Sequence, residues 1–206
     1  MKLLNRAFLL LLPMLFFIAS ALAIDISEFG DFSSRSIIMS GKKKILTQEQ
    51  KDLLISKKLA PTTKCLMEQI KQNKNEYVEL LLDFGVNPNE SYMSEYPIYI
   101  AAKEDNFIAL KMLFEKGAKL DRGFNSELYA SVKNKNREMA QYLLDRKANV
   151  NYKDSVTENT ILYLALKNKM LAIAKQLIEK GAYADNKSVI YIKKKKLHYL
   201  IKEKIN

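Results

Sequence analysis

Residue types that could carry out catalysis are scarce in this chain of 206 residues, which holds one cysteine, Cys65, and one histidine, His198. A thiol beside an imidazole could act as a nucleophile and its base. The same two side chains fall short of the four ligands of a tetrahedral zinc site. No phosphate-binding loop of the Gly-x-x-x-x-Gly-Lys-Ser/Thr type occurs. We therefore predict no catalytic residues, no metal, no cofactor and no small-molecule substrate, and we interpret Cys65 as a small buried hydrophobe.

A ten-residue sequence motif, called the first phrase, recurs at 80–89, 112–121, 142–151 and 176–185. It determines the helices around these residues. Each copy places apolar residues at helical spacing before a helix-stop position, where the backbone turns left-handed and glycine is favoured. That position holds Gly85, Gly117, Lys147 and Gly181. These residues lie 32, 30 and 34 positions apart, a period that predicts a stacked solenoid. Since Lys147 is the weakest helix stop, we expect the third repeat to be the least regular.

A second phrase precedes three of these copies, at 96–102, 126–132 and 160–166. Ser126 and Thr160 stand where a hydroxyl can accept a free amide of the first helical turn, and Pro97 fits the first helical position. Small residues then allow neighbouring helices to approach closely, namely Ala101, Ala102, Ser131 and Ala165. Each repeat is therefore two short antiparallel helices and a loop, and it needs neighbours to bury its apolar face.

The second phrase resembles the Thr-Pro-Leu-His-x-Ala-Ala opening of the ankyrin repeat, and the first resembles its Leu-Leu-x-x-Gly-Ala-x-x-Asn close. The resemblance spans roughly residues 62–201. It implies an all-α fold, an ankyrin-type α-solenoid of stacked helix-turn-helix repeats with capping helices. The histidine of the family is replaced throughout, by Met67, Tyr99, Tyr129, Tyr163 and Tyr191. A tyrosine hydroxyl can serve the same hydrogen bond between repeats.

The phrases divide the chain into segments. A signal peptide (1–23) and a flexible leader (24–45) precede an N-terminal capping helix (46–60), which has a capping box from Thr47 to Gln50 and is stopped near Ala60 by Pro61. Repeats follow at 61–90, 91–122, 123–152 and 153–186. The first is degenerate, because its opening at Lys64 lacks the cap, the proline and the small pair. A C-terminal capping half-repeat (187–206) opens at Ser188.

The N-terminus has the outline of a secretory signal peptide. Lys2 and Arg6 precede an uncharged run from Ala7 to Ala23, and small residues at its end suit cleavage after Ala23. The run is 17 residues long, at the short limit for a membrane-spanning helix, so a retained membrane anchor is the alternative. We expect an exported protein, periplasmic or secreted. The abundance of lysine, asparagine and isoleucine suggests an AT-rich bacterial genome.

The formal net charge is +11, and it falls to +9 without Lys2 and Arg6. Such an excess favours anionic partners. Its densest part, Lys193 to Lys196, is interpreted as the solvated end of the stack. One alternative is that these lysines contact an acidic protein or a membrane. Another is that they contact nucleic acid, which is disfavoured if the protein is exported.

Binding of another protein is the function that these observations leave. Cys65 falls in the first inner helix and His198 in the final cap, several repeats apart, so no catalytic dyad is expected. Ankyrin-like repeats generally hold proteins on their loop tips and concave face, which implies a non-catalytic protein-protein interaction module with a partner of unspecified identity. The candidate contact residues on the loops are Tyr92, Met93, Tyr96 and Phe124. We expect a monomer that does not bind nucleic acid and contacts a membrane only if its N-terminal segment is retained; a membrane-tethered scaffold with a basic C-terminal cap is the alternative.

Overall fold

The computed structural model describes residues 47–200. The predicted signal peptide and leader, together with the last six residues, lie outside this range. The described helices are α2 (Gln48–Ser56), α3 (Thr63–Lys71), α4 (Asn75–Phe84), α5 (Pro97–Lys103), α6 (Phe107–Glu115), α7 (Glu127–Lys133), α8 (Arg137–Asp145), α9 (Ile161–Lys167), α10 (Leu171–Glu179), α11 (Asn186–Lys194) and the 3-10 helix η2 (His198–Leu200). The described residues contain no β-strand.

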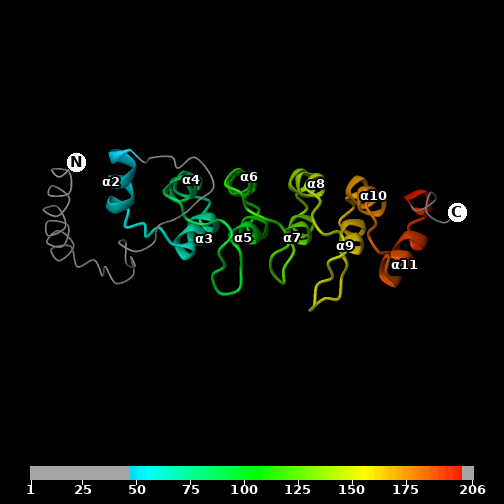
Figure 1. The fold of residues 1–206 in the computed structure, drawn as a ribbon. Helices are drawn as coiled ribbons and strands as arrows, with labels where there is room; N and C mark the ends of the chain where they lie inside the picture. The colour runs from blue at the N-terminus through cyan, green and yellow to red at the C-terminus, as the bar shows by residue number, and fades with distance from the viewer. Residues whose placement is uncertain (1–46, 201–206) are drawn as a thin grey trace, which may run out of the picture.

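From α3 onward the helices form two layers of a solenoid (Figure 1). Helices α3, α5, α7, α9 and α11 make the inner layer, and each contacts the next. Helices α4, α6, α8 and α10 make the outer layer, and a loop precedes each inner helix from α5 to α9. One apolar core runs through the stack, and the small residues Ala101, Ala102, Ser131 and Ala165 are fully buried in it. The predicted all-α solenoid is confirmed.

Hydroxyl caps fix where the inner helices begin. The Ser126 hydroxyl accepts the Tyr129 amide at 3.2 Å, and the Thr160 hydroxyl accepts the Tyr163 amide at 3.1 Å, so both predicted caps are confirmed. The prediction that the first repeat lacks a cap is wrong, because the Thr62 hydroxyl accepts the Cys65 amide at 3.2 Å. Helix α3 therefore begins before Lys64 and is two residues longer than α5, α7 and α9.

The last inner helix also begins earlier than predicted. Asp185 caps α11, and its carboxylate accepts the Ser188 amide at 2.9 Å and the Ser188 hydroxyl. A carboxylate is as good a cap as a hydroxyl, which explains why the helix opens at Asn186 and Ser188 lies inside its first turn.

The third repeat is as regular as its neighbours, so the expectation of an irregular repeat at Lys147 is wrong. Lys147 adopts φ 61°, in the same left-handed region as Gly117 at φ 84°. The amide of Ala148 donates to the Leu143 carbonyl at 3.1 Å, as the amide after each glycine stop does. Because this hydrogen bond closes the helix whatever the side chain, the missing glycine raises the backbone energy without changing the geometry.

Helix α2 is shorter than the predicted 46–60 segment, since it ends at Ser56. Lys58 turns left-handed at φ 52°, and the Leu59 amide donates to the Leu54 carbonyl at 2.9 Å. This turn ends the helix before Pro61. Leu54 and Leu59 are buried, whereas Leu53 is exposed.

Asparagine side chains connect successive repeats. The Asn134 amide group donates to the Ala102 and Lys103 carbonyls, both at 3.0 Å, and Asn168 donates to the Val132 carbonyl at 2.7 Å. These carbonyls belong to the last turn of the preceding inner helix, where the i+4 amides of a continuing helix are missing. The bonds therefore hold α7 against α5 and α9 against α7.

Candidate protein-contact surface

The first loop is a tight hairpin before α5. Tyr92 and Glu95 exchange backbone hydrogen bonds of 3.0 and 3.1 Å across Met93 and Ser94. Both intervening residues have positive φ, 50° and 62°. This is the signature of a type I′ turn, which normally takes Asn-Gly or a similar pair. Methionine at such a tip costs backbone energy, and the Met93 side chain is 79% exposed.

The second loop precedes α7 and packs against the first. A Cβ on Gly123 would lie 3.2 Å from the ring of Tyr96, so glycine lets this loop approach the ring closely. The Arg122 guanidinium lies over the same ring at 5.6 Å. Phe124, next to Gly123, projects outward and is 90% exposed.

The third loop precedes α9 and is organised by Asp154. Its carboxylate accepts the Thr157 amide at 2.8 Å and the Thr157 hydroxyl at 2.7 Å, and these bonds lower the pKa of Asp154. Lys187 of α11 donates to the Thr157 carbonyl at 3.2 Å and to the Asn159 side chain at 3.1 Å. The tip residue Val156 is 88% exposed. Internal bonds thus hold an apolar side chain out in solvent.

One exposed apolar residue therefore stands at each of three successive loop tips. Met93 and Phe124 were among the predicted contact residues, and both are exposed. The other two, Tyr92 and Tyr96, are half-buried and pack against the core. Sequence reasoning missed Val156. Its position before the third copy of the second phrase, about one repeat period after Phe124, was the sequence signal that could have identified it.

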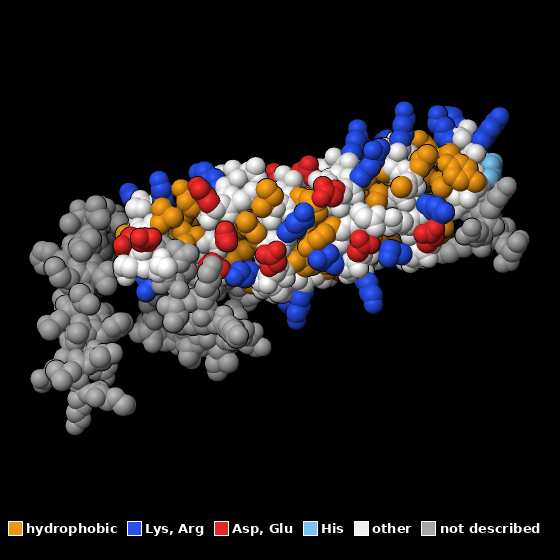
Figure 2. Space-filling view, turned by 90° about the horizontal axis from the view of Figure 1, so that it is seen from above, with side chains coloured by type: hydrophobic (Ala, Val, Ile, Leu, Met, Phe, Trp, Pro, Cys, Tyr) orange, Lys and Arg blue, Asp and Glu red, His pale blue; other side chains and the backbone are white. Residues whose placement is uncertain are grey.

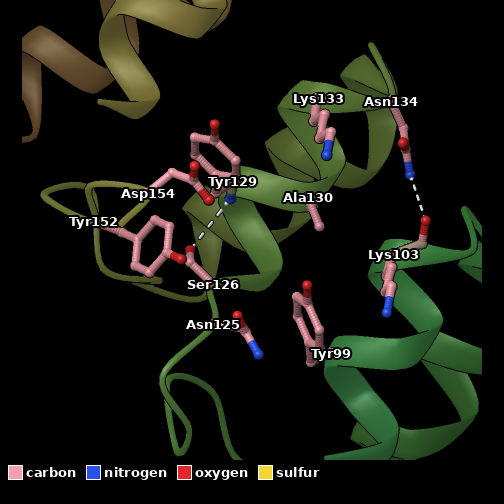
Figure 3. Close-up of a pocket in the computed structure, with 10 residues that line it drawn as sticks. All are labelled: Tyr99, Lys103, Asn125, Ser126, Tyr129, Ala130, Lys133, Asn134, Tyr152 and Asp154. Atoms are coloured by element: carbon pink, nitrogen blue, oxygen red, sulfur yellow. Dashed lines mark hydrogen bonds between the residues drawn. The ribbon is translucent and has the colours of Figure 1, made fainter. Parts of the chain in front are cut away.

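Between the loops and the inner helices lies a hollow of about 130 Å³ (Figure 3). Tyr99 comes from α5, Tyr129 from α7, and Tyr152 from the chain before α9. The rings of Tyr129 and Tyr152 meet edge to face at 5.3 Å. Ligand sites for small molecules usually have at least about 300 Å³. The hollow is therefore of a size to receive one side chain of a partner.

Polar groups surround this aromatic hollow. Burial raises the pKa of Tyr99 and of Tyr152, so both phenols stay protonated and can donate hydrogen bonds. Lys103 and Lys133 line the hollow as well. Of the four tyrosines at this position, Tyr129 makes the expected hydrogen bond, because its hydroxyl lies 3.3 Å from that of Thr157 in the following loop.

Helix α7 also carries a buried carboxyl that the sequence prediction overlooked. Glu127 is 1% exposed, and its carboxylate accepts the Asp121 amide at 3.3 Å. Burial, opposed by a hydrogen bond from its own amide and assisted by the charge of Asp121, raises its pKa to about 7. It occupies the first helical position, which Pro97 and Ile161 fill in the neighbouring inner helices and bury there. The correspondence of Glu127 with Pro97 and Ile161 in the aligned repeats was the sequence signal that could have revealed a buried carboxyl.

The residues considered for catalysis lie far apart. Cys65 lies in α3 and His198 in η2, at opposite ends of the solenoid (Figure 1). Cys65 is buried as predicted, and burial raises the pKa of its thiol, which keeps it a poor nucleophile. Within residues 47–200, no group of three or more histidine, cysteine or acidic side chains could hold a metal ion.

No helix in the described part of the chain has the length and apolar character needed to cross a membrane.

Known proteins match this chain at two levels. The family model for ankyrin repeats (3 copies) matches residues 121–188. Among solved structures, the human ASB11 ankyrin repeat domain matches with a TM-score of 0.51 and 25% sequence identity, over 59% of this chain and 56% of that chain. The match thus spans little more than half of either molecule. No curated protein sequence matches the chain.

Proposed function

The chain is an ankyrin-repeat protein, and on that premise we propose that it binds another protein through its three loop tips and the hollow beside them. Ankyrin repeats generally mediate protein-protein interaction and are typically non-catalytic. The observation that carries the proposal is the register of Met93, Phe124 and Val156, each exposed at a tip that hydrogen bonds or close packing hold in place.

Three features of the tips support a binding role. Exposed apolar side chains are ordinary when scattered singly, but these recur once per repeat. The first tip bears backbone strain, and strain of this kind gathers at functional positions. Ordered loops also lose little conformational entropy when a partner binds.

The hollow supplies the specificity in this proposal. A partner side chain that enters it meets the rings of Tyr99, Tyr129 and Tyr152, and finds phenol donors and lysine ammonium groups around them. Aromatic residues lining a small pocket dominate the energetics of many interfaces. The tips would then contact the surface around that anchor.

Affinity purification tests the proposal. The full chain serves as bait beside a tip variant carrying Met93→Ser, Phe124→Ser and Val156→Ser. A control variant carries Ile108→Ser and Ile190→Ser, which removes exposed apolar side chains from α6 and α11 instead. We expect the control to recover the partner as the wild type does and the tip variant to lose it. Equal recovery by the tip variant would refute the surface.

We also propose that the protein is exported, on the strength of the pattern in residues 1–23. N-terminal sequencing of the mature protein tests this. A start at Ile24 supports export with cleavage, whereas a start at Met1 favours the membrane-tethered scaffold.

A further inference from the structure

Positive charge is distributed unevenly along the solenoid. Residues 126–200 hold 15 lysines and arginines against 7 aspartates and glutamates, whereas residues 47–125 hold 11 against 12. Figure 2 shows the blue side chains gathering toward the C-terminal end of the stack. The excess charge of the repeats therefore belongs to α7 through η2.

Within this region the lysines follow the repeat. Each of α7, α9 and α11 ends in a lysine, and a second lysine follows two positions later in the left-handed turn. We call these six residues the lysine ladder: Lys133, Lys135, Lys167, Lys169, Lys194 and Lys196. All six are exposed, and none forms an ion pair with another residue of the described range.

Three of the six ladder lysines, those at the ends of the inner helices, are explained by helix stability. Lysine in the last turn of a helix offsets the negative end of the helix dipole. The N-terminal repeats have the same feature at Lys71 and Lys103. Lys133, Lys167 and Lys194 are therefore expected in any stack of such helices.

The other three ladder lysines, those in the left-handed turns, are not explained by helix stability. Lys135, Lys169 and Lys196 adopt φ of 62°, 57° and 56°, a conformation that disfavours lysine because its Cβ crowds the following carbonyl oxygen. The equivalent positions in the N-terminal repeats hold Asn73 and Asp105, the residue types that tolerate it. Stability at these turns thus requires no positive charge, and lysine there costs backbone energy.

We propose that the lysine ladder binds an extended acidic segment of the partner protein, an inference that rests on the proposed function. Adjacent inner helices lie roughly 10 Å apart, and an extended chain advances about 3.1 to 3.4 Å per residue. An acidic residue at about every third position would therefore meet each pair of lysines in turn. Lys133 belongs both to the ladder and to the lining of the hollow, so a chain anchored in the hollow can continue along the ladder.

Binding of a defined peptide tests the ladder. The probe is a labelled peptide of six Glu-Ser-Pro units, whose proline-rich backbone places glutamates about 9 Å apart. Fluorescence anisotropy measures its affinity for the full chain. Changing Lys135, Lys169 and Lys196 to Asn should weaken binding about tenfold, as the loss of three exposed ion pairs predicts. Asparagine tolerates the left-handed turn, so folding should be preserved.

The control variant carries Lys64→Asn, Lys119→Asn and Lys180→Asn, the same chemical change and the same loss of charge elsewhere on the surface. It should bind the peptide as the wild type does. An equal loss of affinity in both variants would show a general effect of net charge and would overturn the proposed role of the lysine ladder. Tighter binding of a seven-nucleotide single-stranded DNA, which also carries six charges, or of phosphatidylserine vesicles would overturn the assignment to an acidic protein. The tip variant should keep full affinity for the peptide, which separates this test from that of the proposed function.

Discussion

The buried carboxyl of Glu127 makes the stability of the repeats depend on pH, and Glu127→Gln should remove that dependence. The pKa of this side chain rises from 4.5 to about 7 on folding, chiefly because burial disfavours its charge. A shift of this size corresponds to about 3 kcal/mol at 1.36 kcal/mol per unit. Glutamine keeps the size of the side chain and an oxygen to accept the Asp121 amide.

The protein loses stability as pH rises because the pKa of Glu127 is higher in the folded state than in the unfolded state. Below pH 4.5 the carboxyl is protonated in both states and does not oppose folding. As pH rises from 4.5 to about 7, the unfolded chain ionises while the folded one resists, so stability is lost across that window. Glu127→Gln should therefore raise the free energy of unfolding by about 3 kcal/mol at pH 8 but only about 1 kcal/mol at pH 5.

Urea unfolding followed by circular dichroism at the two pH values measures the difference. Equal effects of Glu127→Gln at pH 5 and pH 8, or destabilisation at pH 8, would refute the reasoning, since the change would then act through packing. Asp121→Asn supplies the control. It removes the neighbouring charge that helps to raise the pKa, so the midpoint of the pH dependence should move to lower pH.

Three further substitutions test how the repeats are held. Lys147→Gly should raise the free energy of unfolding by about 1 kcal/mol and the melting temperature by about 2 to 4 °C, because glycine adopts φ 61° without strain. Gly117→Ala, at an uncrowded site with φ 84°, should lower the melting temperature in thermal unfolding. Asn168→Ala should lower the free energy of unfolding by about 1 kcal/mol in urea, because the Val132 carbonyl loses its bond from the next repeat. No loss of stability would show that this bond does not hold the repeats together.

Much of the fold was predictable from the sequence because its determinants are local and recur. The caps at Ser126 and Thr160 and the stops at Gly85, Gly117 and Gly181 each act within one turn of their own helix. The missed cap at Thr62 shows the limit of matching a phrase. Its hydroxyl does the same work as Ser126, although the residues that follow do not resemble the other copies.

The candidate site was less predictable because its residues meet across repeats. The type I′ turn at Met93 and Ser94 carries no glycine or asparagine to announce it, and the Tyr92–Glu95 backbone hydrogen bonds that close it become visible only in the folded structure. The hollow depends on the register of Tyr99, Tyr129 and Tyr152, which come from α5, α7 and the chain before α9. The strain at Lys135, Lys169 and Lys196 likewise appears only once the backbone is placed.

Site-specific photocrosslinking in the full chain tests the protein-contact surface most directly. A photoreactive phenylalanine analogue placed in turn at 93, 124 and 156 should capture one and the same partner protein. Placed at Ile108, an exposed position of the outer helix α6, it should capture none of that partner. Capture of the partner at Ile108 in equal yield, or at none of the three tips, would contradict the proposed surface.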